Sequence, residues 1–292
     1  MRVNRKKKYY KVINKKGHNG LHYKLGLNID PLPFNPDKDD ECVSGGIYFS
    51  DSNNIFSYFG YGDLIAELEI PEDAKICCNN DWNKARADRI IINKMMSKKD
   101  FIELLIDPDK YNWEKYSHYI AKYSPDKLDP DRFNWDEYSY HVAKYSPDKL
   151  DPDKFNWKDY SWTVAECCPE KLDPDKFNWD EYSWAVAECC PEKLDPDKFN
   201  WDEYSYHVAK YCPEKLDPDK YNWKDDSHYV AEHCPEKLDP DRFNWEDCSH
   251  YVAEHCPEKL DPDKYNWEDD SWAVAEYCPD KLDPDKYKIN HD

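Results

Sequence analysis

The stretch that decides the fold is Leu128-Asp-Pro-Asp-Arg-Phe-Asn-Trp-Asp-Glu-Tyr-Ser-Tyr-His-Val-Ala-Lys-Tyr-Ser-Pro-Asp-Lys149. Its Asn-Trp pair recurs every 22 residues, and eight such units fill residues 106–281 before a ninth begins at Leu282. Fixed periods of this size are typical of solenoids, in which stacked units bury a core that no single unit could bury alone. The pair recurs at Trp113, Trp135, Trp157, Trp179, Trp201, Trp223, Trp245 and Trp267.

Two helical segments are predicted within each unit. Asp129 is a capping residue and Pro130 suits the first helical position, which predicts a short helix or 3₁₀ turn through Phe133. Asn134 then caps a second helix that runs from about Trp135 until Pro147 stops it, with an acidic residue three positions after the cap. One face of this helix carries the apolar and small residues Trp135, Tyr138, Ser139, Val142, Ala143 and Ser146.

Glycine and charge divide the 292-residue chain into two parts. All seven glycines precede residue 63, and residues 1–100 carry a net charge of +3 against −24 for the remainder. We therefore predict a small α+β domain over residues 1–96 and an all-α solenoid of eight 22-residue repeats over 106–292. Between them, residues 97–105 open with Ser97 and Asp100 in a capping-box pattern and predict an N-terminal capping helix.

The first 96 residues contain recognisable strand patterns. Residues 9–14, 46–50 and 63–70 are predicted strands, and residues 53–59 are predicted as a short helix. Residues 84–96 fit either a strand or a helix. This mixture predicts an α+β fold for the domain.

Composition excludes several classes of protein. The net charge of −21 argues against a general nucleic-acid binder, which needs excess lysine and arginine to neutralise phosphates. No apolar run approaches the roughly 18 residues that a membrane span requires, so no membrane association is expected. The mean hydropathy of −1.09 would suit a disordered chain, but 12 Trp, 24 Tyr and 10 Phe predict a folded one.

The twelve cysteines are predicted to be buried structural thiols. Serine replaces cysteine before the proline of the first two units, and equivalent cysteines lie about one helix spacing apart, beyond the roughly 7 Å limit for a disulfide. Cys167 and Cys189 occupy the preceding column, which holds tyrosine or histidine elsewhere. The cysteines before proline are Cys168, Cys190, Cys212, Cys234, Cys256 and Cys278.

Two metal-site interpretations are weaker than structural ones. Histidine and cysteine in adjacent units suit zinc, but each stands in a column that elsewhere holds Tyr, Trp, Asp or Ser. The Asp-Pro-Asp segments lack the third oxygen ligand and the glycine of an EF-hand calcium loop. We therefore predict no metal and no cofactor. The zinc candidates are His228, His233, Cys234, Cys248, His250, His255 and Cys256.

One aromatic column lies away from the predicted core face and is the candidate partner-binding site. Exposed Trp and Tyr side chains are typical binding hot spots. A packing role is the alternative, because a small residue follows each Trp of the column, whereas Tyr or His follows each His or Tyr, as in volume compensation. The predicted partner-binding residues are Tyr140, Trp162, Trp184, Tyr206 and Trp272.

Two further surfaces suggest partners. An acidic array could attract a basic partner or mimic nucleic acid, although most of its charge is explained by caps and solvated helix faces. The final unit has no polar cap, which favours self-association through the C-terminal end.

The N-terminal segments resemble a viral family. His18-Asn-Gly-Leu-His-Tyr-Lys-Leu-Gly-Leu-Asn28, Gly45-Gly-Ile-Tyr-Phe-Ser-Asp51 and Ile70-Pro-Glu-Asp-Ala74 are similar to the N-terminal domain of mimivirus-type giant-virus repeat proteins, in which it often precedes ankyrin repeats. The 22-residue units also resemble repeat arrays of such viruses. The resemblance implies a viral protein in a host cell, in the cytoplasm, the virus factory or the virion.

An enzyme is the alternative from another class. His18-Asn-Gly and Gly46-Ile-Tyr-Phe-Ser50 faintly resemble the parts of ADP-ribosyltransferases in which a His and a Tyr hold NAD. The resemblance would give Glu67 or Glu69 the role of stabilising the transition state, although neither lies in a recognisable motif. We predict instead a non-enzymatic interaction or scaffold protein that binds a host or viral protein through the array. A passive virion component is a further alternative.

Overall fold

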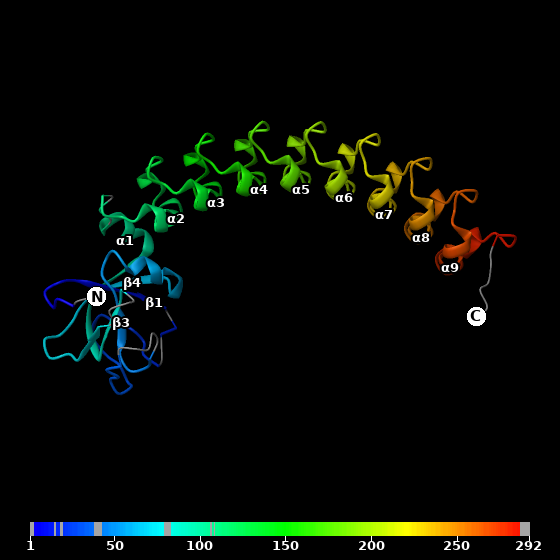
Figure 1. The fold of residues 1–292 in the computed structure, drawn as a ribbon. Coiled ribbons are helices and arrows are strands. Elements are labelled where there is room, and N and C mark those ends of the chain that lie inside the picture. The colour runs from blue at the N-terminus through cyan, green and yellow to red at the C-terminus, as the bar shows by residue number, and fades with distance from the viewer. Residues whose placement is uncertain are drawn as a thin grey trace. The chain divides into compact units, whose positions relative to one another are not determined.

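The structure is a computed structural model that describes residues 3–14, 16–17, 20–37, 43–78, 83–105, 107 and 109–286. The chain forms two compact units, Met1–Lys149 and Leu150–Asp292. The first contains two antiparallel sheets and the start of the helical array, and the second contains only array units. An α+β domain followed by an all-α array of eight 22-residue units is the predicted fold class, and the structure confirms it (Figure 1).

A four-stranded antiparallel sheet forms the larger part of the N-terminal region. Its order is β1 (Tyr9–Ile13), β4 (Leu64–Glu69), β7 (Arg89–Ser97) and β2 (Gly26–Ile29). The central strands β4 and β7 bury their apolar side chains, and Leu68 is wholly enclosed. The sheet therefore has its core at the centre and its most exposed strand, β2, at one edge.

A second antiparallel sheet has three short strands. Its order is β3 (Ile47–Phe49), β6 (Ala85–Ala87) and β5 (Ile76–Cys78). Paired backbone hydrogen bonds of 2.8 Å between Tyr10 and Ser50 link β1 to the end of β3. This link brings the first strand of the chain beside the second sheet.

The sequence patterns identified some strands of the domain and missed others. The strands predicted at residues 9–14, 46–50 and 63–70 are confirmed as β1, β3 and β4, and the predicted short helix is the 3₁₀ helix η1 (Ile55–Tyr61). The ambiguous segment 84–96 consists of strands β6 and β7. Strand β2 was missed because its apolar residues Leu27 and Ile29 are about half exposed, so it lacks the alternation of a half-buried strand. The short β5 was also missed.

The predicted capping helix is present as α1 (Lys98–Leu105). Its capping box is complete, because the Asp100 N–H donates to Ser97 Oγ at 3.0 Å and the Ser97 backbone N–H donates to the Asp100 carboxylate at 3.4 Å. Phe101 and Ile102 are buried in the same hydrophobic cluster as Tyr10 of β1. Helix α1 therefore packs against the sheet domain as well as against the first array helix. The domain boundary between residues 96 and 97 stays a prediction.

Each array unit consists of a turn, an 11-residue α-helix and a three-residue 3₁₀ helix. The helix starts at Trp and is capped by the preceding Asn, whose side-chain oxygen accepts the N–H three residues on, as predicted. Every helix ends just before the residue that precedes proline. The helices are α2 (Trp113–Tyr123), α3 (Trp135–Tyr145), α4 (Trp157–Cys167), α5 (Trp179–Cys189), α6 (Trp201–Tyr211), α7 (Trp223–His233), α8 (Trp245–His255) and α9 (Trp267–Tyr277).

The short segments of the unit differ from the prediction. Residues 129–133 form a hydrogen-bonded turn, closed by the Phe133 N–H on the Asp129 carbonyl at 2.9 Å, and no helix is assigned there. The Asp129 carboxylate accepts the Asp131 N–H at 3.0 Å, which satisfies the aspartate locally. The 3₁₀ helix after each α-helix, such as η3 (Pro147–Lys149), was not predicted. Proline ends the α-helix there, yet its fixed backbone angle also suits a tight turn.

Within the second unit, the helices α4 to α9 stack in chain order (Figure 1). The Val and Ala near the middle of helices α4 to α8, such as Val186 and Ala187, are buried between neighbouring helices, and the Trp that starts each of the helices α4 to α9 is at least nine-tenths buried. The serine of each helix, such as Ser183, is also buried. Small residues thus lie where neighbouring helices approach most closely, as the repeat pattern predicts.

Candidate partner-binding surface of the helical array

Adjacent units are joined through a serine and an asparagine. The backbone N–H of Asn200 donates to Ser183 Oγ of the preceding helix at 3.2 Å, and its side-chain amide donates to the Asp180 carbonyl at 2.9 Å. Its side-chain oxygen caps its own helix through the Glu203 N–H. The capping asparagine is thus satisfied at three groups, and the serine column has a structural role. The same serine–asparagine contact occurs at Ser161, Ser205, Ser227 and Ser249.

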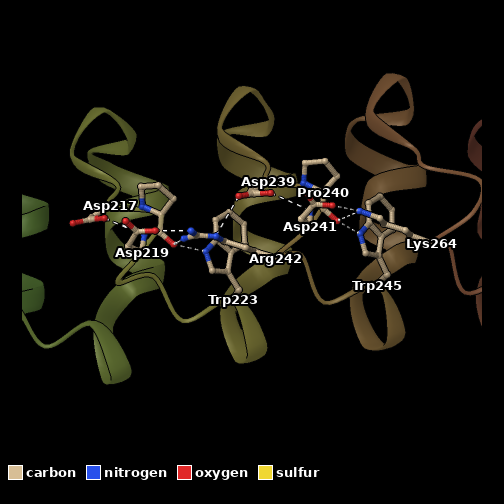
Figure 2. A network of polar contacts seen from close by, with 10 residues as sticks. Asp217, Asp219, Trp223, Asp239, Pro240, Asp241, Arg242, Trp245 and Lys264 are labelled. Carbon is tan, nitrogen blue, oxygen red and sulfur yellow. Dashed lines mark hydrogen bonds and ion pairs between the residues drawn. The ribbon is translucent and has the colours of Figure 1, made fainter.

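A second contact joins the turns of adjacent units (Figure 2). The Pro240 carbonyl accepts the indole N–H of Trp245 in its own unit at 2.9 Å and the Lys264 ammonium of the next unit at 3.0 Å. The same lysine forms an ion pair with Asp241. We call this repeated set of contacts the turn ladder. Within the second compact unit, Leu150–Asp292, its ion pairs are Asp153–Lys176, Asp175–Lys198, Asp197–Lys220, Asp219–Arg242, Asp241–Lys264 and Asp263–Lys286.

The turn ladder explains much of the Asp-Pro-Asp motif. The first aspartate, such as Asp173, accepts the N–H of Asp175 at 3.0 Å and so shapes the turn. Asp175 bonds to Lys198, and this hydrogen bond is the main cause that lowers the pKa of the Asp175 carboxyl below its ordinary value. Much of the acidic charge is therefore structural.

The predicted partner-binding residues lie on the array helices. Trp162, Trp184 and Tyr206 on α4, α5 and α6 are partly buried, and Trp272 on α9 is 49% exposed. Tyr140, on α3 in the other compact unit, is also partly buried and its ring contacts His141. These side chains both pack and remain accessible to a partner, so the two interpretations are compatible.

Ring contacts connect this column from helix to helix in the second unit. Tyr206 stacks on Tyr229 of the next helix at 5.0 Å between ring centroids, and Trp184 lies 6.0 Å from His207. A ring of one helix thus meets the following column of the next helix, so these side chains take part in packing between units. We call this set the aromatic strip. It comprises Trp162, Trp184, Tyr206, His207, His228, Tyr229, His250, Tyr251 and Trp272.

Three array histidines, His118, His141 and His207, have pKa values lowered by burial. Burial, helped by the nearby Lys210 charge, lowers the pKa of His207 to about 4. The Nδ1 atom of His207 is buried and has no hydrogen-bond partner within the described part of the chain. His118 and His141 in the first compact unit have the same features, with pKa values lowered to about 4 mainly by burial. These rings act as aromatic packing groups near neutral pH.

Two carboxylates on the core side of the array helices, the partly buried Asp226 and the buried Asp270, were not predicted. In most units a tyrosine follows the helix-starting Trp by three positions, and Tyr204 donates its hydroxyl to the Glu181 carbonyl at 3.1 Å. Asp226 and Asp270 replace that tyrosine, and their carboxylates accept the serine hydroxyl of the preceding helix at 2.5 and 2.7 Å. Burial is the main cause that raises the pKa of Asp226. The sequence carries a signal for these two carboxylates, because an aspartate replaces a tyrosine on the core-facing side of the helix.

The cysteines divide into two groups. The cysteines that precede proline are buried, as predicted, and desolvation raises the pKa of Cys190 and Cys212 to about 12. Cys167 and Cys189, however, are exposed at the ends of α4 and α5, so the prediction that they are buried was wrong. Their column is the last position of the helix and turns outward. Across the described residues, no group of three His, Cys, Asp or Glu side chains is arranged to hold a metal ion.

Among the residues of the enzymatic alternative that the structure describes, Tyr48 is not brought together with the two glutamates. His18 lies outside the described residues. Tyr48 lines a cavity of the N-terminal domain, and its hydroxyl donates to the Val43 carbonyl at 3.0 Å. Glu67 forms an ion pair with Lys8 at 2.8 Å, and neither Glu67 nor Glu69 is among the described residues that line that cavity. The geometry therefore places neither of the two proposed glutamates beside Tyr48.

The fold defines a helical repeat protein with an α+β N-terminal domain. No helix within the described ranges is long and apolar enough to span a membrane. Comparison with known proteins places relatives in Acanthamoeba polyphaga mimivirus. One, described as an ankyrin repeat protein, is 33% identical over 111 residues, covering 38% of this chain and 30% of the relative. Another with the same description is 30% identical over 112 residues, covering 37% of this chain and 51% of the relative.

These comparisons support a giant-virus repeat protein. The chain spans only about a third to a half of the relatives described above. Its own period of 22 residues, with one α-helix per unit, differs from the 33-residue, two-helix unit of an ankyrin repeat. No family model and no solved structure matches the chain.

Proposed function

We propose that this chain is a non-enzymatic interaction protein that binds a host or viral protein through the aromatic strip of the array. The supporting observation is the run of ring contacts from α5 to α9, whose side chains are only partly covered. Aromatic side chains that are already held by packing lose little conformational freedom on binding, and Trp and Tyr are enriched among binding hot spots.

The negative charge of the array indicates the chemistry of the partner that we propose. Exposed glutamates stand near the C-terminal ends of the array helices, including Glu188, Glu232 and Glu254. Residues 101–292 carry a net charge of −24. A complementary segment would combine apolar side chains that cover the rings with lysine or arginine that meets the acidic groups. Complementary charge speeds association, and salt weakens the attraction between the charges.

Affinity capture with full-length protein tests this function. Host cells would express the wild type, Trp184→Ala, Tyr206→Ala and, as a matched surface control, Glu192→Gln on the exposed 3₁₀ helix η5 (Pro191–Lys193). The proposal expects a specific protein that the wild type and the control enrich and that both strip variants lose. Equal enrichment by all four would contradict it, provided that thermal melts show the variants to be folded.

A further inference from the structure

Exposed aliphatic side chains gather at one edge of the N-terminal domain. Five of the leucine and isoleucine residues that the structure describes are exposed, and four of them are Leu25, Leu27, Ile29 and Leu32. Leu27 and Ile29 belong to β2, the edge strand of the four-stranded sheet, and are 47% and 53% exposed. Single exposed leucines are common on protein surfaces, whereas a contiguous apolar patch indicates an interaction surface.

The backbone groups of these two β2 residues point away from the sheet. The Asp30 N–H donates to the Asp88 carbonyl at 2.9 Å, so the pairing of Ile29 with Arg89 is of the non-hydrogen-bonded kind, and the same holds for Leu27 two positions earlier. In such pairs the N–H and C=O groups of each residue point away from the partner strand. Among the described residues, no strand pairs with the outer edge of β2. The N–H and C=O groups of Leu27 and Ile29 therefore face this edge.

The side chains of the same two residues lie on the outer face of the sheet. Asn28, between them, is 2% exposed and points to the opposite face, as the alternation of a strand requires. Its side-chain amide donates to the Lys24 and Gly26 carbonyls at 2.7 and 2.9 Å. Edge strands of folded proteins are usually protected by lysine, proline or another charged residue, and β2 itself contains none of these. An apolar edge of this kind is suited to pairing with another strand.

We infer that β2 pairs antiparallel with β2 of a second copy of this chain, about a two-fold axis at Asn28. In this register Leu27 of each copy lies opposite Ile29 of the other, and the two pairs exchange the backbone hydrogen bonds that the outer edge offers. The apolar side chains of one copy then pack beside those of the other. Because the interface is two-fold, it closes at a dimer.

The charges that flank β2 favour a second copy in this orientation. Lys24 precedes the strand and Asp30 follows it, so the two ends of the segment carry opposite charge. Antiparallel pairing places the lysine end of one copy beside the aspartate end of the other, whereas parallel pairing would place like charges together. Asp30 itself falls opposite Gly26, so no like charges face each other. The inference concerns the N-terminal domain and is independent of partner binding by the array.

Analytical ultracentrifugation of the full-length chain between about 1 and 100 µM tests the inference. The wild type should show a monomer–dimer equilibrium. Leu27→Lys should raise its dissociation constant at least about tenfold, because the two-fold axis places two unpaired charges in an apolar contact. Leu104→Lys, at a leucine of α1 that is 63% exposed and lies outside the patch, is the matched control and should not change it. Thermal melts establish that each variant is folded.

A compensating substitution tests the register. In Leu27→Lys/Ile29→Glu, the introduced lysine of each copy lies opposite the introduced glutamate of the other, so dimerisation should recover relative to Leu27→Lys alone. A register in which Leu27 faces its own copy would instead set like charges opposite each other. A double variant that associates no better than Leu27→Lys would therefore contradict the pairing.

Hydrogen exchange distinguishes pairing of β2 from association elsewhere on the chain. The amides of Leu27 and Ile29 should exchange more slowly at about 100 µM than at about 1 µM in the wild type, and equally fast at both concentrations in Leu27→Lys. A wild type that is monomeric at about 100 µM, an association that Leu27→Lys leaves intact, or assemblies that grow beyond the dimer would each overturn the inference.

Discussion

The hydroxyl oxygen of Ser249 accepts the backbone N–H of Asn266 at 3.2 Å and so ties the middle of one array helix to the start of the next. Because Ser249 is fully buried, no water can replace it at this contact. The contact recurs along the array and explains why a serine, and not only a small residue, stands in this column.

Removing the equivalent hydroxyl of Ser183 should destabilise the array. Ser183→Ala leaves the Asn200 N–H without its acceptor, which should cost about 1–3 kcal/mol. Urea unfolding followed by circular dichroism measures the change. Glu192→Gln, an exposed substitution on η5, should stay within about 0.5 kcal/mol of the wild type. A Ser183→Ala protein as stable as this control would refute the role assigned to the serine.

The turn ladder should give the array a stability that depends on acid and salt. Bonding to lysine lowers the pKa of Asp153, Asp175 and Asp197 in the folded protein. The stabilisation is therefore fully present above the ordinary carboxyl pKa of about 3.9 and is lost as pH falls through the lowered folded value. Melting temperatures below pH 4 should fall less steeply in Asp175→Asn than in the wild type, and salt should reduce the difference. Parallel profiles would contradict this assignment.

His207 should act in a higher pH range. Its pKa is about 4 in the folded protein and about 6.5 when unfolded, so the unfolded chain gains a proton first and stability falls as pH drops from about 6.5 towards 4. His207→Tyr places there the residue that α7 carries as Tyr229, and should reduce this fall. His233→Tyr, at the exposed end of α7, is the matched control. Identical pH profiles for the two variants would show that His207 is not the cause.

The repeat made the array predictable, whereas the domain was less so. Asn134, Trp135 and Pro147 mark both ends of the helix by local chemistry, and eight copies reinforce the pattern. Strand β2 depends on pairing with β7, in which Ile29 meets Arg89, 60 positions further along the chain. The residues of β2 themselves carry little alternation.

The candidate sites were predictable only in part. The aromatic column is visible in the sequence, but contacts such as Tyr206 with Tyr229 connect different units and require the stacking geometry. Residues from separate strands and loops, Lys11 and Tyr48 among them, line the cavity of the N-terminal domain, and no local sequence motif predicts it. Both features are formed by contacts between residues that are far apart in the sequence. The pattern of neighbouring residues does not predict such contacts.

The measurement that tests the central claim most directly is the dissociation constant of the captured partner for full-length wild type, Trp184→Ala and Glu192→Gln. It would be made at low and high salt. We predict that Trp184→Ala weakens binding at least about tenfold, as for an interface hot spot, that Glu192→Gln has little effect, and that salt weakens the wild-type complex. Equal dissociation constants for folded Trp184→Ala and the wild type would contradict the account.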